Sequence, residues 1–139
     1  MSDPGPTGRH YTTPPDIDDI IVLAERALAA IPARLRRHID NVGIAVEDMA
    51  DDATLAEMGI ESGWDLSGLY RGTPLGERSF GDVARGPDLI FLYRQPILLE
   101  WVEEGEDLYR LVRNVLVHEL AHHFGFSDED IERLEAEMD

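Results

Sequence analysis

Residues 105–124 constrain this chain more than any other segment, because their apolar side chains recur at intervals of three and four. That period places the side chains along one face of an α-helix. The apolar residues that follow the period are Leu108, Leu111, Val112, Val115, Leu116 and Phe124. Gly125 comes next, and glycine is the residue that most often ends a helix. The sequence therefore predicts a long helix that stops at Gly125.

Before this segment, the patterns predict a helix, a break and a strand. A helical period begins at Ile17, and aspartates stand in its first turn, where they complement the helix dipole. Because proline lacks the amide donor, Pro32 should bend or stop this helix, and a second short segment is expected to continue it. Over 42–49, apolar residues alternate with smaller or acidic ones, which predicts a strand with one buried face.

The middle of the chain is expected to be rich in loops. Residues 50–65 are acidic and contain two glycines, so we predict a surface loop with at most a short helix over 53–58. Apolar residues over 66–71 and 88–94 predict strands on either side of a turn-rich segment. Pro96 should confine the second strand to a sheet edge or mark its end. Ser127 is expected to cap a last short helix.

Length and charge limit the classes of protein that this chain can be. It has 139 residues, no cysteine, and 12 basic against 29 acidic side chains, which gives a net charge of −17. We expect one domain over 16–139, preceded by a flexible leader over 1–15 that is rich in proline and glycine. The negative field should repel phosphate backbones and anionic membranes, so neither nucleic acid nor membrane is an expected partner. Without a signal peptide or a long apolar run, we predict a cytoplasmic protein.

The predicted long helix contains the sequence H-E-L-A-H over 118–122. Histidines four residues apart lie on one helix face, with Cβ atoms about 5–6 Å apart. Both imidazoles of His118 and His122 can therefore reach one cation. Glu119 lies roughly 100° around the helix, where its carboxylate can reach a water bound to that cation. This is the place of a general base that activates water for attack on a carbonyl.

The motif extends to H-E-L-A-H-H-F-G-F-S-D, with Gly125 and Asp128 at intervals of three after His122. By chance, H-E-x-x-H alone would occur in roughly 2 of a hundred shuffled sequences, and the added glycine and aspartate bring this below roughly one in a thousand. The pattern resembles the extended zincin signature H-E-x-x-H-x-x-G-x-x-D, an aspartate variant of the metzincin site. This resemblance implies that His118, His122 and Asp128 hold one Zn²⁺, with Glu119 as the general base and Gly125 as the turn.

A longer resemblance, over 17–139, is to the small bacterial family of zincin-like or minimal metallopeptidases. It rests on a first helix, the strand-like NVGIAVED, the segment GLYRGTPL, the strand-like IFLYR and the helix VHELAHHFG. It implies an α+β fold, a single compact zincin-like domain. In this fold a small mixed β-sheet packs on the N-terminal helix and the active-site helix, and a short C-terminal helix follows. It also implies a peptide or protein substrate that lies antiparallel to an edge strand above that helix.

The chain departs from metzincins after the motif. Metzincins have a methionine turn below the metal and a subdomain that forms the lower wall of the cleft, whereas few residues follow Gly125 and Met138 is poorly placed for that turn. We therefore expect weak or narrowly specific peptidase activity, unless a partner or a second subunit in a homodimer completes the cleft. One alternative is a metal-binding interaction or regulatory module with little turnover. Another is a non-haem iron oxygenase, although its histidines normally come from barrel strands.

Several other side chains have both a functional and a structural interpretation. His123 points to another helix face than His122 and is expected to be structural, and the helix dipole alone could explain Asp128 at the start of the last helix. The acidic run 47–52 resembles a calcium loop only in composition. Three glutamates offer an alternative third metal ligand or are simply solvated: Glu132, Glu135 and Glu137. Three tyrosines could stabilise an oxyanion or only pack: Tyr70, Tyr93 and Tyr109.

Overall fold

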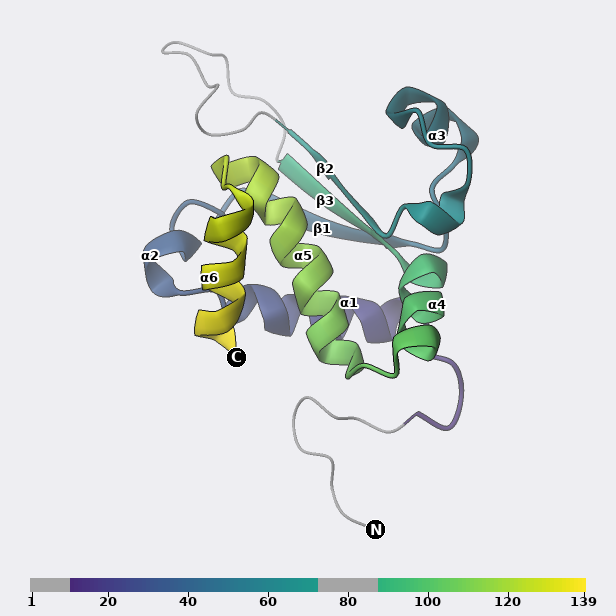
Figure 1. Ribbon diagram of the computed structural model, residues 1–139, viewed down its shortest axis with the longest axis horizontal. Helices are drawn as coiled ribbons and strands as arrows, with labels where there is room; N and C mark the ends of the chain where they lie inside the picture. Colours follow the sequence, from purple (N-terminus) through teal and green to yellow (C-terminus); the bar gives the residue numbers. More distant parts are fainter. Residues whose placement is uncertain (1–10, 73–87) are drawn as a thin grey trace.

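The computed structural model describes residues 11–72 and 88–139. Within these ranges the chain forms six α-helices, a short 3-10 helix and a three-stranded mixed sheet (Figure 1). The elements are α1 (Ile17–Ala29), α2 (Ala33–Arg36), β1 (Val42–Glu47), α3 (Asp52–Met58), η1 (Gly63–Asp65), β2 (Gly68–Arg71), β3 (Asp88–Tyr93), α4 (Arg94–Glu104), α5 (Leu108–Phe124) and α6 (Asp128–Met138). This arrangement confirms the predicted α+β class and the predicted mixed sheet.

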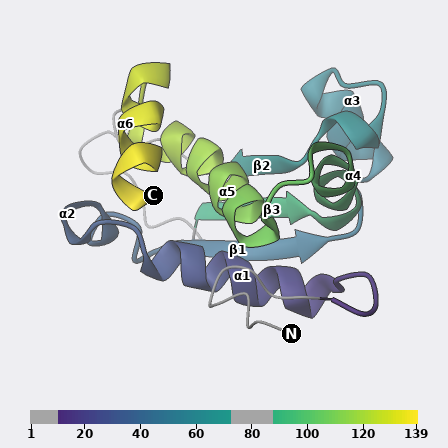
Figure 2. The ribbon, with the colours of Figure 1, turned by 60° about the horizontal axis from the view of Figure 1, so that its bottom comes forward.

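The sheet has the strand order β1-β3-β2, so β3 is central and β2 lies at one edge. β1 runs parallel to β3 and β2 runs antiparallel to it. α1 lies along β1, and α5 packs on α1, β2 and β3, so both helices cover the same face of the sheet (Figure 2). α5 lies between α6 and α4 (Figures 1 and 2). The edge strand β2 therefore runs beside the helix that carries the histidine motif.

The main hydrophobic core lies between α1, α5 and the sheet. Its side chains are almost completely buried, and each stabilises the fold by about 1.5–3 kcal/mol. The largest of them are Ile20, Ile31, Ile90, Leu92, Ile97, Leu116 and Leu120. A smaller cluster contains Leu55, Leu66, Leu69 and Tyr93. Because Tyr93 is only 2% exposed within this cluster, it packs in the core, as its structural interpretation predicts.

Local sequence signals explain where most helices begin and end. Asp16 and Asp19 form a capping box at the start of α1, and Ser127 and Asp130 form another at the start of α6. α1 ends before Pro32, and α2 follows it, as the proline predicts. The three predicted strands and the short helix over 53–58 are present with bounds that differ by a few residues. These parts of the fold were predictable because their signals are local.

The sequence patterns did not predict α4, which begins at Arg94 directly after β3. Pro96 occupies the first turn of this helix, where an amide donor would have no partner within the helix, so the proline is tolerated. Pro96 thus follows the end of β3, which was one of its two predicted positions. The other, at a sheet edge, is wrong because β3 is the central strand. α4 ends at Gly105, whose φ of 64° is in the left-handed region that glycine adopts readily.

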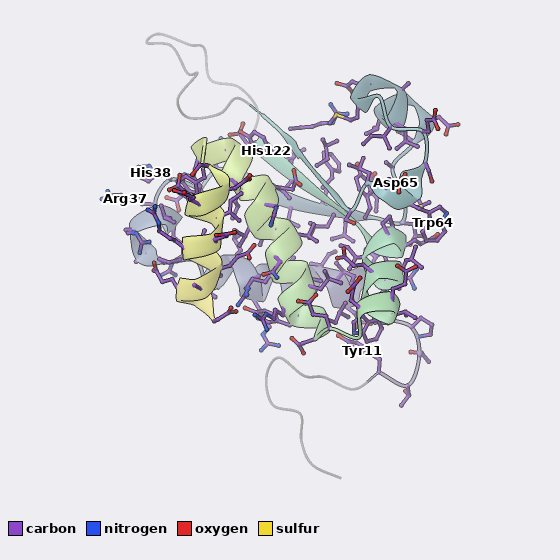
Figure 3. The ribbon with its side chains drawn as sticks, in the orientation of Figure 1. Tyr11, Arg37, His38, Trp64, Asp65 and His122 are labelled. Carbon is purple, nitrogen blue, oxygen red and sulfur yellow. The ribbon has the colours of Figure 1, made fainter. Side chains whose placement is uncertain are left out.

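Two predicted segments fall partly outside the described residues. These are residues 1–10 of the expected leader and most of the turn-rich segment between the second and third strands. Within 11–15, Pro15 is buried, and the ring of Tyr11 packs edge-on against Trp101 at 6.0 Å between centroids (Figure 3). Among the helices of the described ranges, none combines the length and the apolar character needed to cross a bilayer.

Candidate metal centre

The histidine motif lies in the second half of α5, as predicted, and ends at Gly125 with a φ of 71°. The side chains of His118, Glu119 and His122 differ in exposure. The side chains of His118 and His122 are 59% and 65% exposed, whereas that of Glu119 is 14% exposed. Two accessible imidazoles thus flank a mostly buried carboxylate, and His122 lies near the C-terminal end of α5 (Figure 3).

Glu119 is buried because the edge strand β2 passes close to α5. Gly68 makes this approach feasible, since a Cβ atom at this position would stand 2.8 Å from Cγ1 of Val115 and 3.1 Å from Cγ of Glu119. The backbone N–H of Tyr70, also on β2, donates to the Glu119 carboxylate. Burial raises the pKa of Glu119 above its ordinary value of 4.5, and the charges of His122 and His118 and the Tyr70 N–H offset this only in part.

Two contacts link the motif to other carboxylates. Nδ1 of His122 lies 3.6 Å from Oε1 of Glu119, and Nε2 of His118 lies 3.2 Å from Oε1 of Glu135 on α6. Asp128 is exposed in the first turn of α6. In the described ranges, no three histidine, aspartate or glutamate side chains converge on one point that could hold a metal ion. The structure therefore brings the motif residues together on one helix without converging them with Asp128.

The donor chemistry of this region nevertheless fits a divalent cation of the zinc type. Imidazole nitrogen and carboxylate oxygen are both ligands that zinc accepts. His118 and His122 are accessible from the same helix, and Oε1 of Glu135 is buried and makes no hydrogen bond with any described atom. Nε2 of His118 lies 3.2 Å from this oxygen but forms no hydrogen bond with it, and a cation beside the oxygen would offset the cost of burying it.

A buried polar network lies behind the motif and was not predicted. His123 is 2% exposed, and its Nδ1 lies 3.1 Å from the hydroxyl of Tyr70 and 3.1 Å from Oδ2 of Asp88. The Tyr70 hydroxyl donates to Oδ2 of Asp88 at 3.2 Å, and Nε2 of His123 lies 2.9 Å from the carbonyl oxygen of His38. His123 is therefore structural, as expected. The Tyr70 hydroxyl faces this network, which favours the structural interpretation of Tyr70 over its alternative role with an oxyanion.

A cleft of about 540 Å³ opens beside the motif, between α5, α4, η1 and β2. His118 and Glu119 form one end of its lining. Four further carboxylates line the rest of it: Asp65, Glu100, Glu104 and Glu106. Burial and the like charges of Glu106 and Glu104 raise the pKa of Glu100. The cleft is thus an acidic surface that leads directly to the buried carboxylate of the motif.

Comparison with known proteins bears on this geometry. The sequence profile of the zincin-like metallopeptidases matches residues 39–138, which is more than two thirds of the chain and includes all of β1 to α6. The chain belongs to the zincin-like metallopeptidase family. Comparison with curated protein sequences gives no match. This membership confirms the predicted family. For a zincin-like metallopeptidase, the family implies a zinc ion and the hydrolysis of peptide bonds.

Proposed function

We propose that this chain is a zinc-dependent peptidase, with His118, His122 and Asp128 as the metal ligands and Glu119 as the general base. The observation that supports this most strongly is the position of Glu119. Its carboxylate is mostly buried, lies between two exposed histidines of one helix, and accepts a hydrogen bond from the edge strand. An ordinary surface glutamate of a helix would have neither the burial nor the contact with the strand.

The proposed reaction is the attack of water on a peptide carbonyl. Zinc, when bound, supplies a water whose pKa is lowered towards neutrality. Glu119 takes a proton from the attacking water at its carboxylate and then passes it to the leaving amine. The Tyr70 N–H keeps the carboxylate in place beside His122. Burial raises the pKa of Glu119 and so favours its uptake of a proton, whereas a bound cation would lower that pKa.

The edge strand and the acidic cleft define the substrate that we propose. β2 has a strand partner on one side only among the described residues, so an extended peptide can lie along its other side, where the Tyr70 N–H already donates to Glu119. Backbone pairing alone selects no side chains. The carboxylates of the cleft favour peptides with basic side chains and disfavour acidic ones. We therefore propose weak or narrowly specific turnover of basic or neutral peptides.

The test compares wild type with Glu119→Gln and His122→Ala, purified without chelators. Zinc content is measured by elemental analysis, and hydrolysis is measured on basic, neutral and acidic peptides. We expect one zinc per chain in wild type and in Glu119→Gln, loss of zinc in His122→Ala, and hydrolysis by wild type alone. Glu132→Gln, which changes an exposed glutamate of α6, should retain both properties and serves as the control.

The same experiment separates the peptidase from its main alternative. A metal-binding interaction module would hold zinc in wild type and lose it in His122→Ala, but it would cleave none of the peptides. Equal zinc content in wild type and His122→Ala would instead show that the motif is not the metal site.

A further inference from the structure

Glu135 differs from the other carboxylates of α6 in its surroundings. Its side chain is 24% exposed, and its Oε1 atom is buried without a hydrogen bond to any described atom. That atom lies 3.2 Å from Nε2 of His118. Glu132 and Glu137, the other two glutamates considered as metal ligands, are exposed. One oxygen of Glu135 is therefore withdrawn from solvent and directed at a histidine of the motif.

The distance between the two atoms is informative. A charge-assisted hydrogen bond between nitrogen and a carboxylate oxygen is usually about 2.7–2.9 Å long. Two atoms that bind one zinc ion at about 2.0–2.2 Å stand roughly 3.4 Å apart at the tetrahedral angle. The observed separation of 3.2 Å exceeds the first range and comes close to the second. A separation of 3.2 Å is also the upper limit of an ordinary N–H···O contact, so the pair is spaced as an ion pair or as two ligands of one cation can be.

The position of Glu135 is fixed by contacts on both sides of α6. Both carboxylate oxygens of Glu137 accept hydrogen bonds from Arg34 at 2.7 Å. Asp139 accepts one from Arg113 at 2.6 Å. These pairs hold the C-terminal turns of α6 against α2 and α5, so Glu135 faces His118 because of the packing of the helix and not through its own contact alone.

We propose that Glu135 is an additional ligand of the metal, supplying a carboxylate oxygen on the side of His118. This inference rests on the proposed function, since it needs a metal at His118 and His122. It adds a carboxylate to the three ligands that the sequence motif implies, since Glu135 stands two turns after Asp128 on the same face of α6. The proposed site therefore has two carboxylates from one helix.

The test measures the zinc affinity of the full chain by competition with a chromogenic chelator at fixed pH. The variant is Glu135→Gln, which retains the shape of the side chain, and the matched control is Glu132→Gln, which removes the same charge one turn away on a solvated face. We expect Glu135→Gln to weaken zinc binding by at least about 10-fold, the lower end of the cost of losing a group that supports a metal site. Glu132→Gln should change affinity by less than about 2-fold.

A second measurement uses cobalt, whose visible absorption reports the ligands around it. The cobalt-loaded spectrum should change in Glu135→Gln and not in Glu132→Gln. If Glu135→Gln binds zinc as tightly as wild type and has the same cobalt spectrum, the inference is wrong, while loss of zinc in His122→Ala would still support the proposed function. If wild type itself binds no zinc, the proposed function fails and this inference fails with it.

Discussion

The close contact between the edge strand β2 and α5 can be tested by Gly68→Ala. A Cβ atom at this position would stand 2.8 Å from Cγ1 of Val115, nearer than real Cβ contacts, and 3.1 Å from Cγ of Glu119. Either the Val115 side chain must change its conformation or the strand and the helix must move apart. Overpacking of this kind costs about 1–3 kcal/mol, and we expect the free energy of unfolding, measured by urea denaturation, to fall by that amount.

Two further variants show whether the contact with Val115 causes the loss of stability in Gly68→Ala. Removing the methyl groups of Val115 should relieve the closest contact, so Gly68→Ala and Val115→Ala together should cost less than the sum of their separate effects by at least about 0.5 kcal/mol. Gly105→Ala is the control, because a Cβ atom there meets nothing within 4 Å although φ is 64°. It should cost about 1–2 kcal/mol through the backbone alone and show no coupling to Val115.

The same substitution should affect function in a defined way. Displacement of β2 would move the Tyr70 N–H away from the Glu119 carboxylate, whereas none of the three atoms nearest to the added Cβ belongs to His118 or His122. Zinc affinity should therefore stay close to that of wild type while peptide hydrolysis falls. Additive energies in the double variant, or a stability equal to wild type in Gly68→Ala, would refute the reasoning about this contact.

Three further predictions test other parts of the molecule. Tyr70→Phe removes the hydroxyl that contacts Asp88 and His123, and we expect it to lower the free energy of unfolding by about 1–3 kcal/mol in urea; unchanged stability would contradict the structural role of the network. The hydrogen bond from Arg113 holds the pKa of Asp139 in the folded protein below its ordinary value. This contact therefore stabilises the fold fully at pH values above the pKa that Asp139 has in the unfolded chain. The stabilisation is lost as pH falls through the lower pKa of the folded protein. Hydrogen exchange should show α6 loosening first on acidification, and uniform loss of protection along the chain would argue against this. Basic peptides should be cleaved faster than acidic ones at low salt, and a difference that does not shrink at high salt would contradict an electrostatic cause.

Much of the fold could be predicted because its signals are local. Asp16, Pro32 and Ser127 each fix a helix boundary through atoms within a few residues of themselves. The alternation over β1 and the apolar content of β3 identified two neighbouring strands. α4 was missed because Pro96 favours a break when read alone, and only the position of that residue in the first turn makes it compatible with a helix.

Only the part of the candidate site that lies on α5 could be predicted from the sequence. His118, Glu119 and His122 are brought together by helical periodicity, so their spacing in the sequence was sufficient. The network around His123 was not, because Asp88 comes from β3 and the partner carbonyl from the segment before β1. A clue was present in Gly72, where a Cβ atom would overlap the Asp88 carboxylate, but in a turn-rich segment a glycine more often indicates a turn than a close side-chain contact.

The turn at Gly125 links the sequence motif to the tertiary contacts of the site. Its left-handed backbone ends α5 directly after the histidines and, two residues later, allows Ser127 to begin α6. α6 then packs back along α5, which is how a carboxylate as far along the chain as Glu135 comes within 3.2 Å of His118. Together with Asp128 and both histidines, Glu135 would make four protein groups able to hold zinc, the number found in structural centres, whereas catalytic centres keep one position for water. The Glu135 carboxylate would therefore compete with the water that Glu119 activates, which is a physical reason for the weak turnover that we propose.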